Sequence, residues 1–161
     1  MKAHSDVVTL IRLIRTLLIL LAVLVLFNFY GPFSNRFYFG KLDGYLFLLL
    51  AVFQALYLFR LWNKVKHDTA ADTQLRYLEY VVYGVLVVYG YKVLDTILSL
   101  NLASEIQQEL LPTTFFPSMT LSLVVYLGVI LLSILIFTFR RRLLGSFNQE
   151  KLNDNEVRGS L

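Results

Sequence analysis

Two opposite charges lie three residues apart inside a long apolar stretch of this chain. Lys92 and Asp95 are the charged residues of the stretch that runs from Tyr80 to Leu100. A charge at the centre of a membrane-spanning helix costs about 2.5–3.5 kcal/mol, so such groups usually face other helices or a wet cavity. Residues three apart are neighbours on a helix, so Lys92 and Asp95 can pair and lower this cost for each other. They are the first candidates for chemistry within the membrane.

Tyrosine hydroxyls and an amide accompany this pair. At 100° per residue, Tyr80 and Tyr91 share a broad helix face with the two charges, and Gln54 lies within the preceding apolar run. The candidate intramembrane polar site therefore consists of Lys92, Asp95, Tyr91, Tyr80 and Gln54. One interpretation is an ion or proton path, or a ligand site. The interpretation that we favour is structural, because a lysine stem can extend toward the membrane surface and polar contacts between helices act as packing contacts.

The fourth apolar run offers partners for these groups. Ser122, Tyr126 and Ser133 share one face of the helix that this run would form. We expect them to form hydrogen bonds with the tyrosines of the third run.

Composition and run length determine the predicted fold. Of the 161 residues, 57% are hydrophobic and 16% are charged, whereas a soluble domain is about 45–50% apolar and about 25% charged. A membrane span needs about 20 apolar residues of helix, and the runs over residues 13–30, 45–62, 77–100 and 119–139 meet this length. We predict an all-α polytopic membrane protein with a single domain over residues 1–161, folded as a four-transmembrane-helix bundle.

The basic residues predict an orientation. Of the 15 Lys and Arg residues, Arg36 and Lys41 fall in the connector after the first run and Lys92 falls within a run. All the others lie within a few residues of the opposite ends of the runs or beyond them, and Lys and Arg accumulate on the cytoplasmic side of membranes. We therefore predict that both termini face the cytoplasm. The connectors on the other side are rich in aromatic residues, which we interpret as a belt at the headgroup level. The alternative is a recognition surface for a partner or an apolar ligand.

Two charged features lie near the predicted inner boundary. Arg140, Arg141 and Arg142 follow the fourth run, and we interpret them as a membrane-surface anchor, since a basic residue near an anionic surface contributes roughly 1 kcal/mol. Glu79 lies near the start of the third run, where we expect it to reach water or Arg76.

The sequence lacks the residue types and motifs that several kinds of chemistry require. The chain contains no Cys, and its two histidines, His4 and His67, lie outside the apolar runs. Axial haem ligands or a zinc site in the bundle are therefore not expected. A GxSxG nucleophile motif and a glycine-rich phosphate loop are also absent. We expect no catalytic residues, no metal, no cofactor and no nucleic-acid partner.

The order of helices, connectors and tail along the chain resembles that of an uncharacterised family of small bacterial four-helix membrane proteins. The stretches that carry the resemblance are a second helix that runs into a basic connector, an Arg-Tyr start of the third helix and a charged tail with an Asn-Asp element. They correspond to Ala55–Lys66, Leu75–Tyr80 and Phe147–Val157. The resemblance implies a protein of the bacterial cytoplasmic (inner) membrane and assigns no activity.

Three functions fit these observations. The first is a non-enzymatic regulatory or structural subunit of a membrane complex or homo-oligomer, surrounded by membrane lipids. The second is an ion- or proton-conducting assembly that uses Lys92 and Asp95. The third is a binder of a lipophilic ligand such as a lipid, quinone or pigment, with its site between the second and third helices near Gln54, Tyr57, Tyr80 and Tyr91.

Overall fold

Four long helices make up most of the computed structural model, which describes residues 2–40, 42–67, 73–105 and 111–144. The helices are α1 (Lys2–Phe29), α2 (Leu42–His67), α3 (Thr73–Glu105) and α4 (Phe115–Leu144). Each contains a segment long and apolar enough to cross a membrane: Asp6–Phe29, Leu42–Lys66, Leu75–Ser104 and Phe115–Leu143. The expectation of an all-helical protein with four helices is confirmed.

The helices are longer than the predicted spans, for local reasons. Asp43 and Gly44 lie in the first turn of α2, where a carboxylate is favourable. Pro117 lies in the first turn of α4, where a missing backbone N–H costs nothing. Helix α3 continues beyond the third run as far as Glu105, and residues 106–110 lie outside the described residues.

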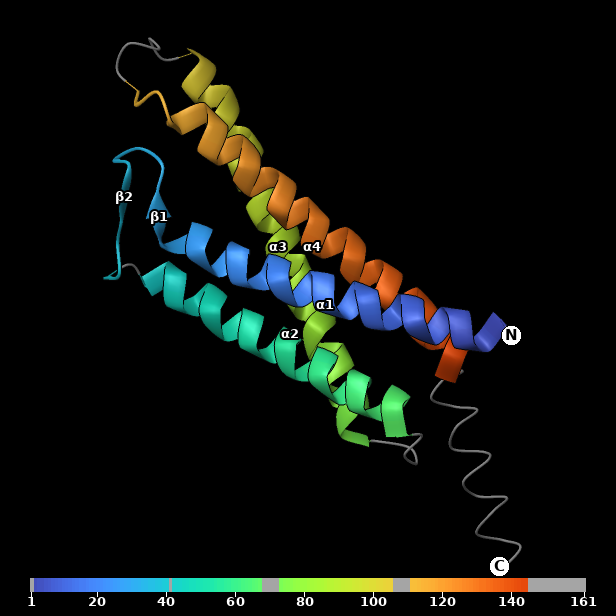
Figure 1. Cartoon of the computed structure of the whole chain (residues 1–161). Coiled ribbons are helices and arrows are strands. Elements are labelled where there is room, and N and C mark those ends of the chain that lie inside the picture. The colour runs from blue at the N-terminus through green and yellow to red at the C-terminus, as the bar shows by residue number, and fades with distance from the viewer. Residues whose placement is uncertain (1, 41, 68–72, 106–110, 145–161) are drawn as a thin grey trace, which may run out of the picture.

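The helices form a closed ring in which α1 packs against α2 and α4, and α3 packs against the same two helices. Consecutive helices run in opposite directions (Figure 1). We call the end where α1 begins and α4 finishes the terminal end. We call the opposite end, where α3 finishes and α4 begins, the hairpin end.

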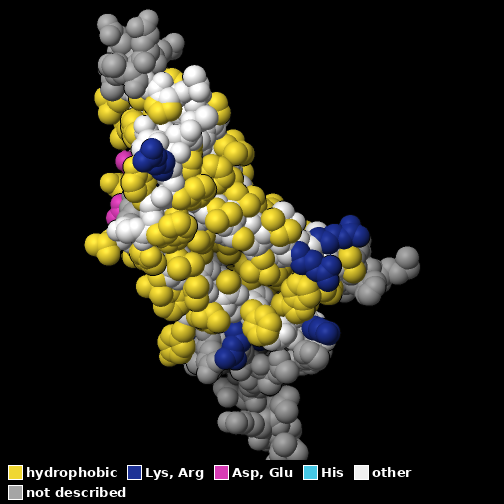
Figure 2. Space-filling view, turned by 60° about the vertical axis from the view of Figure 1, so that its left-hand side comes forward, with side chains coloured by type: hydrophobic (Ala, Val, Ile, Leu, Met, Phe, Trp, Pro, Cys, Tyr) yellow, Lys and Arg dark blue, Asp and Glu magenta, His cyan; other side chains and the backbone are white. Residues whose placement is uncertain are grey.

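The core of the bundle is narrow compared with its apolar surface. Leu10, Ile14 and Leu17 of α1 are fully buried, as is Val129 of α4. Only 28–33% of the residues in the most apolar window of each helix are buried, and hydrophobic side chains cover most of the face shown in Figure 2. Large exposed apolar surfaces are rare on soluble monomers. The surface therefore suits a lipid environment.

A short β-hairpin follows α1, in a connector whose aromatic residues indicated a belt or a recognition surface but not a hairpin. Strands β1 (Tyr30–Gly31) and β2 (Arg36–Phe37) pair antiparallel. Asn35 has a positive φ of 51°, a conformation that asparagine tolerates better than most residues. Its side-chain oxygen accepts a hydrogen bond of 2.6 Å from the Tyr30 hydroxyl, so the turn is held by its own side chains.

Aromatic packing attaches the hairpin to the helices. The ring of Phe33 lies 4.7 Å from that of Phe115 at the start of α4. The ring of Phe29 at the end of α1 lies 5.9 Å from that of Phe39, which follows β2, and 5.2 Å, edge to face, from that of Tyr45 in α2. The hairpin is therefore fixed over one end of the bundle, where it can help to enclose a site.

Candidate functional site

Three polar residues on α4 each contact a different helix. They are spaced seven residues apart, which keeps them on nearly the same face of α4, about 10 Å from one to the next. These residues are Tyr126, Ser133 and Arg140. Their partners are Asn28 of α1, Gln54 of α2 and Glu79 of α3 respectively. We call the three contacts the α4 ladder.

The contact of the α4 ladder nearest the terminal end is a buried ion pair. Arg140 Nη1 lies 2.9 Å from Glu79 Oε2, and the two side chains are only 2% and 5% exposed. Tyr83 donates a hydrogen bond of 2.9 Å to Glu79 Oε1, and Arg141 donates one of 3.1 Å to the Tyr83 hydroxyl. Each oxygen of the carboxylate thus faces a partner, which limits the cost of burying its charge.

This ion pair corrects two interpretations from the sequence. Arg140 was interpreted as part of a membrane-surface anchor, but its side chain is inside the bundle, and only Arg141 and Arg142 are exposed. Glu79 was expected to reach water or Arg76, but it is 4% exposed and pairs with a residue distant in sequence. The packing of the helices turns both side chains toward the inside of the bundle. The positions of the two residues at the ends of apolar runs do not indicate this.

The middle contact of the α4 ladder crosses the bundle. Gln54 donates a hydrogen bond of 2.7 Å to the Ser133 hydroxyl, and Ser133 donates to the backbone oxygen of Val129. Gln54 and Ser133 are 1% and 3% exposed. Gln54 therefore connects opposite members of the ring and does not join Lys92 and Asp95 in one site.

The charged pair predicted from the sequence does form. Lys92 Nζ lies 2.9 Å from Asp95 Oδ2, with the side chains 25% and 45% exposed. The Lys92 ammonium also lies 5.8 Å from the centre of the Phe47 ring. By contrast, Tyr80 and Tyr91 are 59% and 68% exposed on the outer face of α3. The five residues predicted as one polar site therefore lie in three different environments.

Lys92 and Asp95 line a polar cavity of about 490 Å³ at the hairpin end. Its walls come from α1, the hairpin, α3 and α4, and it reaches down to the Tyr126–Asn28 contact of the α4 ladder. Four side-chain hydroxyls from α3 and α4 also line it: Thr96, Ser99, Ser118 and Ser122. Its size falls within the range of about 300–1,000 Å³ typical of ligand pockets.

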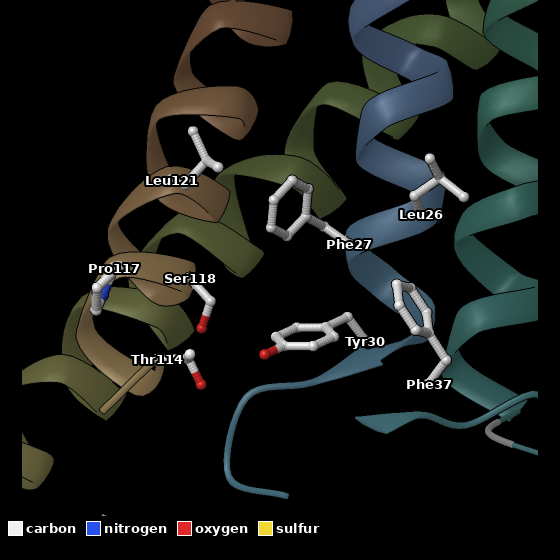
Figure 3. A pocket seen from close by; sticks show the side chains of 8 residues that line it. All are labelled: Leu26, Phe27, Tyr30, Phe37, Thr114, Pro117, Ser118 and Leu121. Carbon is white, nitrogen blue, oxygen red and sulfur yellow. The ribbon is translucent and has the colours of Figure 1, made fainter. Parts of the chain in front are cut away.

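An apolar groove of about 440 Å³ adjoins this cavity. The rings of Phe27, Tyr30 and Phe37 line one side, and Pro117 and Leu121 at the start of α4 line the other (Figure 3). The remaining wall residues are Leu26, Thr114 and Ser118. Leu26 and Leu121 are 60% and 51% exposed, so the groove opens on the side of the bundle.

The groove and the cavity have walls in common. Phe27, Tyr30 and Ser118 line both. A single molecule lying across these residues would have an apolar portion beside rings and leucines, and a polar portion beside an ion pair and hydroxyls. The composite site therefore has the polarity of an amphiphile.

Most residues of this site were not predicted from the sequence. Asn28 was not singled out, and Ser122 and Tyr126 were expected to bond with tyrosines of the third helix. Instead, Tyr126 donates to Asn28 at 2.7 Å. The spacing of seven between Tyr126, Ser133 and Arg140 was the available signal for the α4 ladder, since apolar helices rarely repeat polar residues on one face without a partner.

Comparison with known proteins yields no match: no family model, curated protein or solved structure matches the chain. Among the residues whose side chains the structure describes, no three His, Asp or Glu lie close enough together to hold a metal ion. The side chains of His4 and His67 are outside this set. The site is therefore interpreted from its own geometry.

Proposed function

We propose that this protein is an integral membrane protein that binds an amphiphilic lipid at the hairpin end of its bundle. The observation that carries the proposal is the shared wall of Phe27, Tyr30 and Ser118 between an apolar groove and a polar cavity. The hydrocarbon chains of the lipid would cover the apolar surface of the groove and so remove it from contact with headgroups and water. The polar side chains of the cavity would form hydrogen bonds and ion pairs with the lipid head group. Of the three functions that fit the sequence, this is the binding of a lipophilic ligand. The proposed site lies between α1, the hairpin and α4, and not between α2 and α3 as expected from the sequence.

Filling the groove tests the proposal. Leu121→Trp adds bulk to the groove, whereas Leu131→Trp makes the same change at a residue of α4 that is 61% exposed and does not line it. Native mass spectrometry of the gently purified protein should find a bound lipid in the wild type and in Leu131→Trp, and much less in Leu121→Trp. Equal occupancy in all three, with equal thermal stability, would refute the site. A flux into liposomes whose pH dependence changes in Asp95→Asn would instead support a conducting assembly.

The proposed setting is the cytoplasmic membrane of a bacterium, with the terminal end in the cytoplasm. Its support is the gathering of basic residues at the terminal end, which the positive-inside rule places in the cytoplasm. Because the chain has no cysteine, single cysteines can report orientation. Ser34→Cys in the exposed hairpin should react with an impermeant thiol reagent in intact cells, and Lys66→Cys near the end of α2 should not. The reverse pattern would overturn the orientation.

A second candidate function, a subunit of a homo-oligomer, is favoured by one exposed face of α3. Exposed residues follow one another along it at spacings of three and four, which is the pattern of a helix-packing seam. They are Tyr77, Tyr80, Gly84, Val87, Tyr91, Leu94 and Leu98. A Cβ built on Gly84 meets nothing within 4 Å, so this position leaves room for close approach of a second copy.

Disulfide cross-linking in native membranes tests this second candidate. Val87→Cys places a thiol at the centre of the α3 face, and Leu131→Cys places one on exposed α4. A covalent dimer from Val87→Cys alone supports self-association through α3. Dimers from both variants, or from neither, would argue against a specific contact between copies, and a cross-link to a different protein would replace the second copy with a partner subunit.

A further inference from the structure

Several hydroxyls that line the polar cavity already donate their hydrogen to the protein. The hydroxyl of Thr96 donates to the Lys92 backbone oxygen at 2.8 Å, and that of Ser118 donates to the Phe115 backbone oxygen at 2.9 Å. Since a hydroxyl has one hydrogen and two lone pairs, these two oxygens face a ligand as acceptors.

The floor of the cavity continues this pattern. Tyr126 gives its hydrogen to Asn28 Oδ1 at 2.7 Å, and Asn28 Nδ2 donates to the Leu24 backbone oxygen at 2.8 Å. The Tyr126 oxygen therefore retains acceptor capacity only. The Asp95 carboxylate, which accepts and cannot donate when ionised, adds to it. A ligand group that donates several hydrogen bonds matches this surface.

One strong donor lies beside the acceptors. The Lys92 ammonium has three hydrogens, of which one is directed at Asp95 Oδ2 at 2.9 Å. A ligand with only a negative charge would draw Lys92 away and leave the Asp95 carboxylate without its cation. A ligand that carries both a negative and a positive charge would give Lys92 and Asp95 one new partner each. Neither side chain would then be left as a poorly solvated charge without a partner.

We infer that the lipid head bound in this cavity is zwitterionic, with a phosphate on Lys92 and a primary ammonium on Asp95 and on acceptor hydroxyls from among Thr96, Ser118 and Tyr126. This inference rests on the proposed lipid-binding function and specifies its ligand. A primary ammonium has three N–H donors, whereas a trimethylated ammonium has the same charge and none. The oxygens of Asp95, Thr96, Ser118 and Tyr126 therefore distinguish two head groups that carry the same charge.

The test compares three phospholipids with identical chains. Full-length protein in detergent is mixed with equal amounts of phosphatidylethanolamine, phosphatidylcholine and phosphatidylglycerol, and the lipids that remain after gentle delipidation are counted by native mass spectrometry. We expect phosphatidylethanolamine to be retained about tenfold over each of the others, the ratio expected when a hydrogen bond to a charged group is lost. Retention of phosphatidylcholine equal to that of phosphatidylethanolamine would overturn the inference.

Two variants assign the roles of the charged pair. Asp95→Asn should reduce the preference for phosphatidylethanolamine over phosphatidylglycerol about tenfold, because the ammonium loses its counter-charge. Lys92→Gln should lower the retention of all three lipids, because each has a phosphate. Arg36→Gln in β2, which lines neither the groove nor the cavity, is the matched control and should change nothing. An unchanged preference in Asp95→Asn would contradict the inference.

Failure of the inference and failure of the proposed function give different results. If lipid is retained without head preference, and Leu121→Trp abolishes retention, the groove binds lipid but the head is not selected as inferred. If the wild type retains none of the three lipids, the proposed function fails and this inference fails with it. A measurement of thermal stability for each variant excludes unfolding as the cause of a loss.

Discussion

Two ion pairs among the described residues each join a carboxylate to a cation at 2.9 Å, but they differ in burial and in the helices that they connect. Glu79 and Arg140 come from different helices and are almost completely buried at the terminal end. Lys92 and Asp95 come from one helix, three residues apart, and remain partly exposed in a cavity at the hairpin end. The first pair has its partners within the protein, and the second has capacity left for a ligand.

This difference shows how burial separates a structural role from a binding role. A buried charge whose partner is removed is costly, so the Glu79–Arg140 pair restricts how α3 and α4 can rotate or slide against each other. A local pair on one helix restricts no other helix. Lys92 and Asp95 can therefore change partners without a change in the bundle, which a binding site requires.

The largest effect is expected when the buried pair is broken. Glu79→Leu leaves the Arg140 guanidinium without its carboxylate, and unfolding in detergent should become easier by about 3–5 kcal/mol. The double variant Glu79→Leu/Arg140→Met should recover most of this loss, since apolar groups of similar size can replace a buried pair. A loss in the double variant as large as in the single one would show that the pair does not act as a unit.

A smaller effect is expected at the middle contact of the α4 ladder. Ser133→Ala removes the acceptor of the buried Gln54 amide, and we expect a loss of about 1 kcal/mol in the free energy of unfolding. Thr138→Ala is the matched control, because Thr138 also donates to a backbone oxygen of α4, that of Ile134, but is exposed. Equal losses in the two variants would assign the effect to α4 itself and not to the contact with α2.

The smallest effect on stability is expected at the exposed pair. Asp95→Asn should change the free energy of unfolding by about 0.5 kcal/mol or less, the usual contribution of a partly solvated pair within one helix. The same thermal or denaturant curves used for Glu79→Leu measure it. A loss that approaches the one in Glu79→Leu would remove the distinction between the two pairs, and with it the argument that Lys92 and Asp95 are available to a ligand.

The helices and the local charged pair were predictable from sequence. An apolar run of sufficient length specifies a helix of that length in lipid, and the 3.6-residue repeat brings Lys92 beside Asp95 in any helix that contains both. The β-hairpin was not predicted, because its two strands have only two residues each and depend on a single residue, Asn35, in a left-handed conformation.

The partners across the bundle could not be predicted in the same way. The runs of this chain are apolar on all faces, so the local sequence does not indicate which side of a helix faces inward. For this reason Tyr80 and Tyr91 were predicted to be in the site, although they face outward. Arg140 sits at the end of an apolar run, a position that suits a surface anchor equally well.

By itself the sequence therefore determined four helices, their approximate extents and the Lys92–Asp95 pair, because each depends on residues that are neighbours along the chain. Only the tertiary structure decided that Arg140 meets Glu79 and that a groove and a cavity share the wall of Phe27, Tyr30 and Ser118. These contacts depend on how each helix is rotated and shifted against the others. The sum of many weak packing contacts over the whole bundle sets that rotation and shift.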